Sequence, residues 1–88
     1  MLNRYKLRDI VEKIFQINVF NLMEYQDKYY FQKKVLEEVP EFSDKEVYSA
    51  VENLLSKGNN FNSKDFTNKL SDELYTIYLA RENATTSR

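Results

Sequence analysis

Residues 42–47 read FSDKEV, a stretch that determines where one helix begins. Ser43 can accept a hydrogen bond from the amide of Glu46, and the Glu46 carboxylate can accept one from the amide of Ser43. Phe42 and Val47 stand on either side of this capping box at the positions of a hydrophobic staple. The pattern therefore predicts a helix that starts directly after Ser43.

A similar stretch, FNSKDF, occupies residues 61–66. Here Asn62 is the cap, Asp65 is the returning acid, and Phe61 and Phe66 are the staple pair. The likeness between the two stretches follows from the chemistry that starts helices, since each cap contributes about 1 kcal/mol to its helix. We interpret the pair as two helix starts, and not as a duplicated functional site.

Apolar residues recur at spacings of three and four along most of the chain, which predicts amphipathic helices. Pro40 ends the helix before it, and Gly58 suits the position after a helix C-terminus. The expected helices cover residues 5–17, 22–39, 44–57 and 63–82. One glycine and one proline in 88 residues leave little material for the turns of a β domain. The sequence thus predicts an all-α fold, a compact bundle of about four antiparallel helices.

The chain is the size of one domain, which we expect to span residues 1–82. Residues 83–88, NATTSR, are predicted to be a polar, flexible C-terminal tail. No apolar run approaches the length of a membrane span, and charges interrupt the apolar residues of the N-terminus. We therefore expect a cytoplasmic protein that does not act on a membrane.

Catalysis has few candidate residues in this sequence. There is no histidine to act as a general base at neutral pH and no cysteine to act as a nucleophile or zinc ligand. No glycine-rich phosphate-binding motif is present. We expect a protein that is not an enzyme, with no catalytic residues, no metal site and no cofactor.

Acidic residues concentrate in the middle of the chain, where residues 35–56 hold six acids and one base. The cluster could steer the protein towards a basic partner, or imitate a nucleic-acid backbone. The alternative is that these are solvated acids near helix ends, where Asp44 and Glu46 favour a helix N-terminus. The predicted steering residues are Glu37, Glu38, Glu41, Asp44 and Glu46.

Seven tyrosines and six phenylalanines make the chain rich in aromatic residues, and tyrosine is enriched at protein interfaces. Met23 and Tyr30 fall off the main apolar face of their helix, seven residues apart. Tyr75 and Leu79 fall off the face of theirs, one turn apart. We predict that these four residues form a protein-binding surface. The alternative is that the bundle itself covers them.

The stretch SDKEVYSAVENLLSKG, residues 43–58, resembles the recognition-helix region of winged-helix proteins. The resemblance covers these sixteen residues and rests on a capped start, an apolar rhythm and a final Lys-Gly. It implies a DNA-binding transcriptional regulator in which Lys45, Ser49, Glu52 and Asn53 are exposed, with Tyr48 at the edge. The stretch departs from the pattern after Gly58, because another helix start follows where a β-wing is expected.

The function that we expect from these features is non-catalytic. The chain would bind another protein, or itself as a homodimer, and act as a regulator, adaptor or inhibitor. An inhibitor encoded by a phage or mobile element suits its small size and its richness in Asn, Lys, Tyr and Phe. The alternative is the helix-turn-helix or winged-helix-like DNA-binding regulator, with nucleic acid as the partner.

Overall fold

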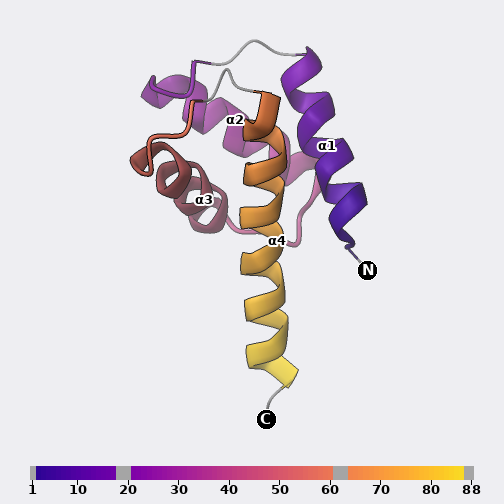
Figure 1. Ribbon diagram of the computed structural model, residues 1–88. Coiled ribbons are helices and arrows are strands. Elements are labelled where there is room, and N and C mark those ends of the chain that lie inside the picture. The colour runs from indigo at the N-terminus through magenta and orange to yellow at the C-terminus, as the bar shows by residue number, and fades with distance from the viewer. Residues whose placement is uncertain (1, 18–20, 61–63, 87–88) are drawn as a thin grey trace.

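Four helices form the bundle (Figure 1). They are α1 (Arg4–Ile17), α2 (Tyr25–Glu38), α3 (Asp44–Ser56) and α4 (Lys64–Thr86). The computed structural model describes residues 2–17, 21–60 and 64–86, and these ranges contain helices and turns without a β-strand. The predicted all-α bundle is confirmed. In Figure 1, α1 and α4 run antiparallel side by side, while α3 is seen nearly end-on beside α4.

Helices α1 and α3 begin and end within one residue of the predicted bounds, but α2 starts three residues late. A turn before α2 explains the difference. The side-chain oxygen of Asn21 accepts a hydrogen bond from the amide of Met23 at 3.1 Å. The amide of Asn21 in turn donates to a carboxylate oxygen of Asp27 at 2.6 Å. Such local side-chain bonds compete with a helix, so residues 22–24 form a turn in its place.

Both ends of α3 are capped as the sequence predicts. The Ser43 amide donates to Glu46 Oε1 at 2.8 Å, and the Glu46 amide donates to Ser43 Oγ at 3.3 Å. At the other end Gly58 has a φ of +83°. Its amide donates to the Leu55 carbonyl, and the amide of Asn59 donates to the Leu54 carbonyl. This pair of bonds is a Schellman motif.

Helix α4 is longer than predicted, because it continues through Thr86. The expected domain end at residue 82 falls inside this helix. The flexible tail over residues 83–88 stays a prediction, with 87–88 outside the described residues. The cap residues Phe61 and Asn62 also lie outside them. In Figure 1 the C-terminal turns of α4 extend past the other helices, which gives the molecule its elongated dimensions of 40 × 24 × 22 Å.

The core contains a junction of three phenylalanine rings from α1, α2 and α4. The Phe15 ring lies 5.1 Å from the Phe31 ring and 6.1 Å from the Phe66 ring, centroid to centroid. Phe31 and Phe66 are almost completely buried, and Phe15 is half-buried. Aromatic pairs at these separations stabilise a fold beyond the area that they bury.

A second cluster attaches the start of α3 to the second half of α4. The Phe42 ring meets the Tyr78 ring edge to face at 6.3 Å. The Arg81 guanidinium lies 5.9 Å from each of these two rings. Arg81 Nη1 also donates to Glu46 Oε1 at 2.8 Å, the oxygen that closes the capping box. One carboxylate therefore connects the α3 cap to α4.

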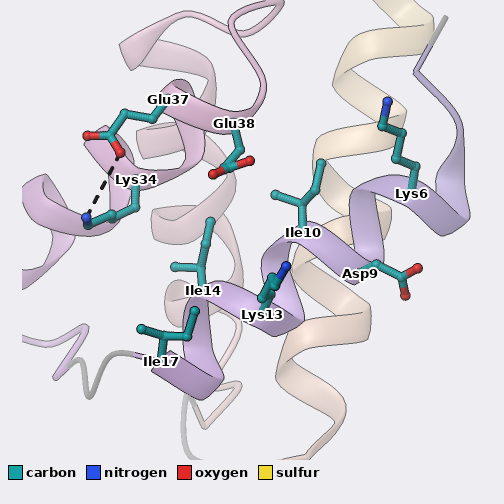
Figure 2. Close-up of a pocket in the computed structure, with 9 residues that line it drawn as sticks. All are labelled: Lys6, Asp9, Ile10, Lys13, Ile14, Ile17, Lys34, Glu37 and Glu38. Carbon is teal, nitrogen blue, oxygen red and sulfur yellow. Dashed lines mark ion pairs between the residues drawn. The ribbon is translucent and has the colours of Figure 1, made fainter.

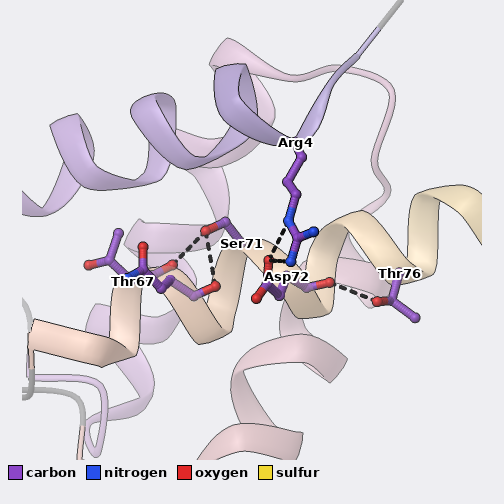
Figure 3. A network of polar contacts seen from close by, with 6 residues as sticks. Arg4, Thr67, Ser71, Asp72 and Thr76 are labelled. Carbon is purple, nitrogen blue, oxygen red and sulfur yellow. Dashed lines mark hydrogen bonds and ion pairs between the residues drawn. The ribbon is translucent and has the colours of Figure 1, made fainter.

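Polar contacts join α1 to the middle of α4 (Figure 3). Arg4 donates from Nε and Nη2 to Asp72 Oδ1, at 3.0 and 2.9 Å. Ser71 beside it is buried, and its hydroxyl donates to the Thr67 carbonyl at 2.6 Å. Because this hydroxyl bonds to its own helix, burying it leaves no unsatisfied polar group.

The conformation of Gly58 yields a stability prediction. A Cβ at this position would have no heavy atom within 4 Å, so steric contact adds nothing to the cost of a substitution. We expect Gly58→Ala to lower the free energy of unfolding by about 1–2 kcal/mol, because alanine is strained at a positive φ. Urea denaturation followed by circular dichroism measures this loss. Gly58→Asn is the matched control, and it should lose less because asparagine tolerates this conformation. Equal losses for Ala and Asn would contradict the explanation.

Candidate protein-binding surface

A groove runs between α1 and α2, which we call the α1/α2 groove (Figure 2). Its volume is about 320 Å³. Its floor is a row of three isoleucines from α1, namely Ile10, Ile14 and Ile17. Ile14 is buried and Ile10 half-buried, but Ile17 is 73% exposed. The row therefore runs from the core to the surface within the groove.

Charged side chains form the two walls of the α1/α2 groove. The α1 wall carries Lys6, Asp9 and Lys13, and the α2 wall carries Lys34, Glu37 and Glu38. Figure 2 shows Asp9 directed away from α2, whereas Glu38 points across the groove towards α1. Charges around an apolar floor resemble the anatomy of a protein interface, with a hydrophobic centre and a polar rim.

The outer face of α2, beside the groove, is a row of tyrosines and lysines. Tyr25 is 74% exposed and Tyr29 is 45% exposed. The Lys33 ammonium lies 5.0 Å from the centre of the Tyr29 ring, and the Lys34 ammonium lies 5.3 Å from that of Tyr30. The lysines thus partly cover the tyrosine rings and hold them against the helix.

The predicted binding residues Met23 and Tyr30 are both exposed, at 67% and 49%. Met23 lies in the turn before α2, and not on the helix as its spacing from Tyr30 suggests. Tyr30 is adjacent in sequence to Phe31 and one turn before Lys34, which lines the groove. Tyr30 therefore lies on the same side of α2 as Lys34, about 100° around the helix from Tyr29.

The second predicted pair divides between core and surface. Tyr75 is half-buried against the core, and its ring stacks on the Tyr78 ring at 6.1 Å with 21° between the planes. Leu79 is 41% exposed. Both belong to α4, and neither lines the α1/α2 groove. The two predicted pairs thus lie apart, with Met23 and Tyr30 before and on α2 and with Tyr75 and Leu79 on α4.

The predicted steering acids have different environments. Glu37 and Glu38 line the α1/α2 groove, and Glu37 pairs with Lys34 at 4.0 Å. Glu41 and Asp44 are exposed in the turn before α3 and in its first helical turn. Glu46 is occupied by the capping box and by Arg81. The acids therefore do not form one surface, and the groove contains only two of them.

The exposed side of α3, where the winged-helix resemblance places DNA contacts, carries Lys45, Tyr48 and Ser49 at its surface. Glu52 forms an ion pair with Lys28 of α2. Asn53 donates from its side-chain amide to Glu73 of α4 at 2.9 Å. Two carboxylates, those of Glu52 and Glu73, line the hollow beside this helix. A phosphate backbone favours lysine and arginine in such a place.

The described ranges also bear on metal binding and membrane spanning. Among residues 2–17, 21–60 and 64–86, no group of three or more acidic, histidine or cysteine side chains could hold a metal ion. Nor is any helix in these ranges both long and apolar enough to cross a membrane. The α1/α2 groove, with its apolar floor and charged walls, is the candidate site that we consider further.

Sequence reasoning did not identify Ile17 as a surface residue, although a signal was present. The apolar residues of α1 cover a wide arc of the helix, with Phe15 on one edge and Ile17 on the other. An arc wider than one packing interface needs a second partner. Which edge of the arc is left at the surface depends on how α1 packs against α2. The spacing of apolar residues in the sequence does not specify that packing.

Comparison with known proteins gave no relatives. No protein-family model, no curated protein and no solved structure matches this chain significantly.

The different environments of Tyr75 and Leu79 give a testable difference in stability. Tyr75→Ala should lower the free energy of unfolding by about 1–3 kcal/mol, because it removes a half-buried, stacked ring. Leu79→Ala should cost less than about 1 kcal/mol, since much of that side chain is already in water. Chemical denaturation of the two variants against the unmodified protein measures both values. A larger loss for Leu79→Ala would show that Leu79, and not Tyr75, belongs to the core.

Proposed function

We propose that this chain is a non-catalytic protein-binding module that acts as a regulator, adaptor or inhibitor through the α1/α2 groove. The observation that supports it most is the isoleucine row, which ends in Ile17 at 73% exposure. Leaving a large aliphatic side chain in water forgoes about 1.5–3 kcal/mol of hydrophobic stabilisation, which a bound partner would recover.

The tyrosines of α2 extend the proposed surface beyond the groove. Tyrosine buries a large area with few rotatable bonds and keeps a polar group at its tip, so it is common among the residues that dominate binding energy. Tyr25 and Tyr29 are accessible, and Lys33 stays close to the Tyr29 ring. A partner seated in the groove and reaching over α2 would contact both the apolar floor and these rings.

DNA binding through α3 has weaker support. The exposed side of that helix combines Lys45 with the carboxylates of Glu52 and Glu73 nearby. Binding to duplex DNA draws most of its affinity from cations that neutralise phosphates, and its strength falls steeply with salt. The carboxylates beside α3 therefore weigh against DNA binding, and protein binding stays the working proposal.

The proposal is tested by comparing two substitutions on α1. Ile17→Ser removes the exposed isoleucine of the groove, and Tyr5→Ser removes a side chain of equal exposure, 72%, that lies outside the groove. Affinity capture from the cells that encode the protein, with quantitative mass spectrometry, measures what each variant binds. We expect Ile17→Ser to reduce capture of the partner at least about tenfold, from the lost burial of one side chain. Tyr5→Ser should leave capture unchanged.

Both substitutions affect exposed side chains, so each variant should keep its helical circular dichroism and melting temperature. The proposal fails if the set of captured proteins is the same for the unmodified protein and for Ile17→Ser. It also fails if Tyr5→Ser reduces capture as strongly.

A further inference from the structure

The walls of the α1/α2 groove carry opposite charges that do not meet. Lys6 and Lys13 line the α1 side, and Glu37 and Glu38 line the α2 side. No ion pair joins the two walls in the part of the chain that the structure describes, where the α2 wall holds only the local Lys34–Glu37 pair. The α1 wall, with Lys6, Asp9 and Lys13, is thus net basic, and the α2 wall, with Lys34, Glu37 and Glu38, is net acidic. The apolar floor separates them.

The isoleucines of the floor are spaced so that a helix can pack against them. Ile10, Ile14 and Ile17 follow one another at four and three residues along α1. They form a row about 10 Å long at 1.5 Å per residue. A helix that lies in a groove inserts residues spaced three, four and seven apart, so its apolar face matches a row of this length.

We infer that the occupant of the α1/α2 groove is an amphipathic helix of another protein, with acidic residues along one flank and basic residues along the other. The inference rests on the proposed function and specifies its partner. The acidic flank lies against Lys6 and Lys13, and the basic flank lies against Glu37 and Glu38. Each wall then lies against a flank of opposite charge on the guest helix, and the two walls need not move together.

The positions of the two lysines define the acidic flank further. Lys6 and Lys13 are seven residues apart, which places them on the same side of α1 and two turns from each other. A helix lying alongside α1 meets both lysines with acids that are also two turns apart. The guest helix should therefore carry Glu or Asp at two positions about seven residues apart on that flank.

A second copy of this chain fits the groove less well. A two-fold contact places the same patch of both copies together. Here that patch is concave, with its isoleucines on the floor between two walls. Two such patches face to face leave a void between the floors, whereas a single convex helix fills the space.

A displayed library of amphipathic helices tests the inference. Each 18-residue peptide has aliphatic residues at fixed positions on one face, and the flanking positions vary among Glu, Gln and Lys. The unmodified protein is one bait, and the Lys6→Glu, Lys13→Glu double variant is the second. The third bait, Lys45→Glu with Lys57→Glu, makes the same charge change outside the groove, at two exposed lysines near the ends of α3.

The unmodified protein should enrich peptides with acids on one flank and lysines on the other. The groove variant should enrich lysine on the flank that was acidic, and the control bait should select the same peptides as the unmodified protein. For one selected peptide made synthetically, fluorescence polarisation should show about three- to tenfold weaker binding to the groove variant, as expected for two exposed ion pairs.

Two results would overturn the inference. One is the absence of charge preference in the selection. This would be seen if no peptide is enriched, or if peptides with neutral flanks are enriched as strongly as peptides with charged flanks. The other is a dimer in light scattering that Ile17→Ser dissociates, because the occupant would then be a second copy. If either result occurs while Ile17→Ser still reduces capture of a partner from cells, the inferred occupant is wrong but the proposed function stands. If capture is also independent of Ile17, the proposed function fails with it.

Discussion

The contact of Phe15 with Phe31 and Phe66 determines how α1 is placed, and the groove depends on that placement. A chain of 88 residues buries only a small core, so one aromatic junction between three helices has a large effect on their arrangement. Phe15 and Ile17 are two residues apart, about 160° around the helix. Once the Phe15 ring enters the core, Ile17 is turned to the opposite edge of α1, where it lines the groove.

The elements that sequence predicted best are those whose ends have local causes. The α3 helix has a capping box at Ser43 and a glycine with positive φ after its last turn, and both are determined within a few residues. The start of α2 was predicted less well, because the turn at Asn21 uses side-chain bonds that hydrophobic periodicity does not report. The all-α class followed from composition, since so little glycine and proline leaves few turns, and the four helices followed from the spacing of apolar residues.

The candidate surface could be predicted only in part. Sequence identified Tyr30 because it departs from the apolar stripe of its helix, and Glu37 and Glu38 because they belong to the acidic stretch. The structure places all three on the outer or groove side of α2. It grouped Tyr75 with Leu79, but the Tyr78 ring lies close enough to draw Tyr75 against the core. Whether a residue outside the apolar face of its helix is buried depends on its neighbours from other helices. Tertiary packing determines those neighbours.

The charges of the groove act on orientation more than on affinity. The isoleucine floor favours any apolar helix face, whichever way the helix runs. Turning a guest helix end for end exchanges its flanks, and its acids then lie against Glu37 and Glu38 while its bases lie against Lys6 and Lys13. Like charges placed together in an interface disfavour the complex, so we expect the reversed direction to bind more weakly. A groove with uncharged walls would accept both directions, and the separation of lysines from glutamates across this floor therefore gives the site its polarity.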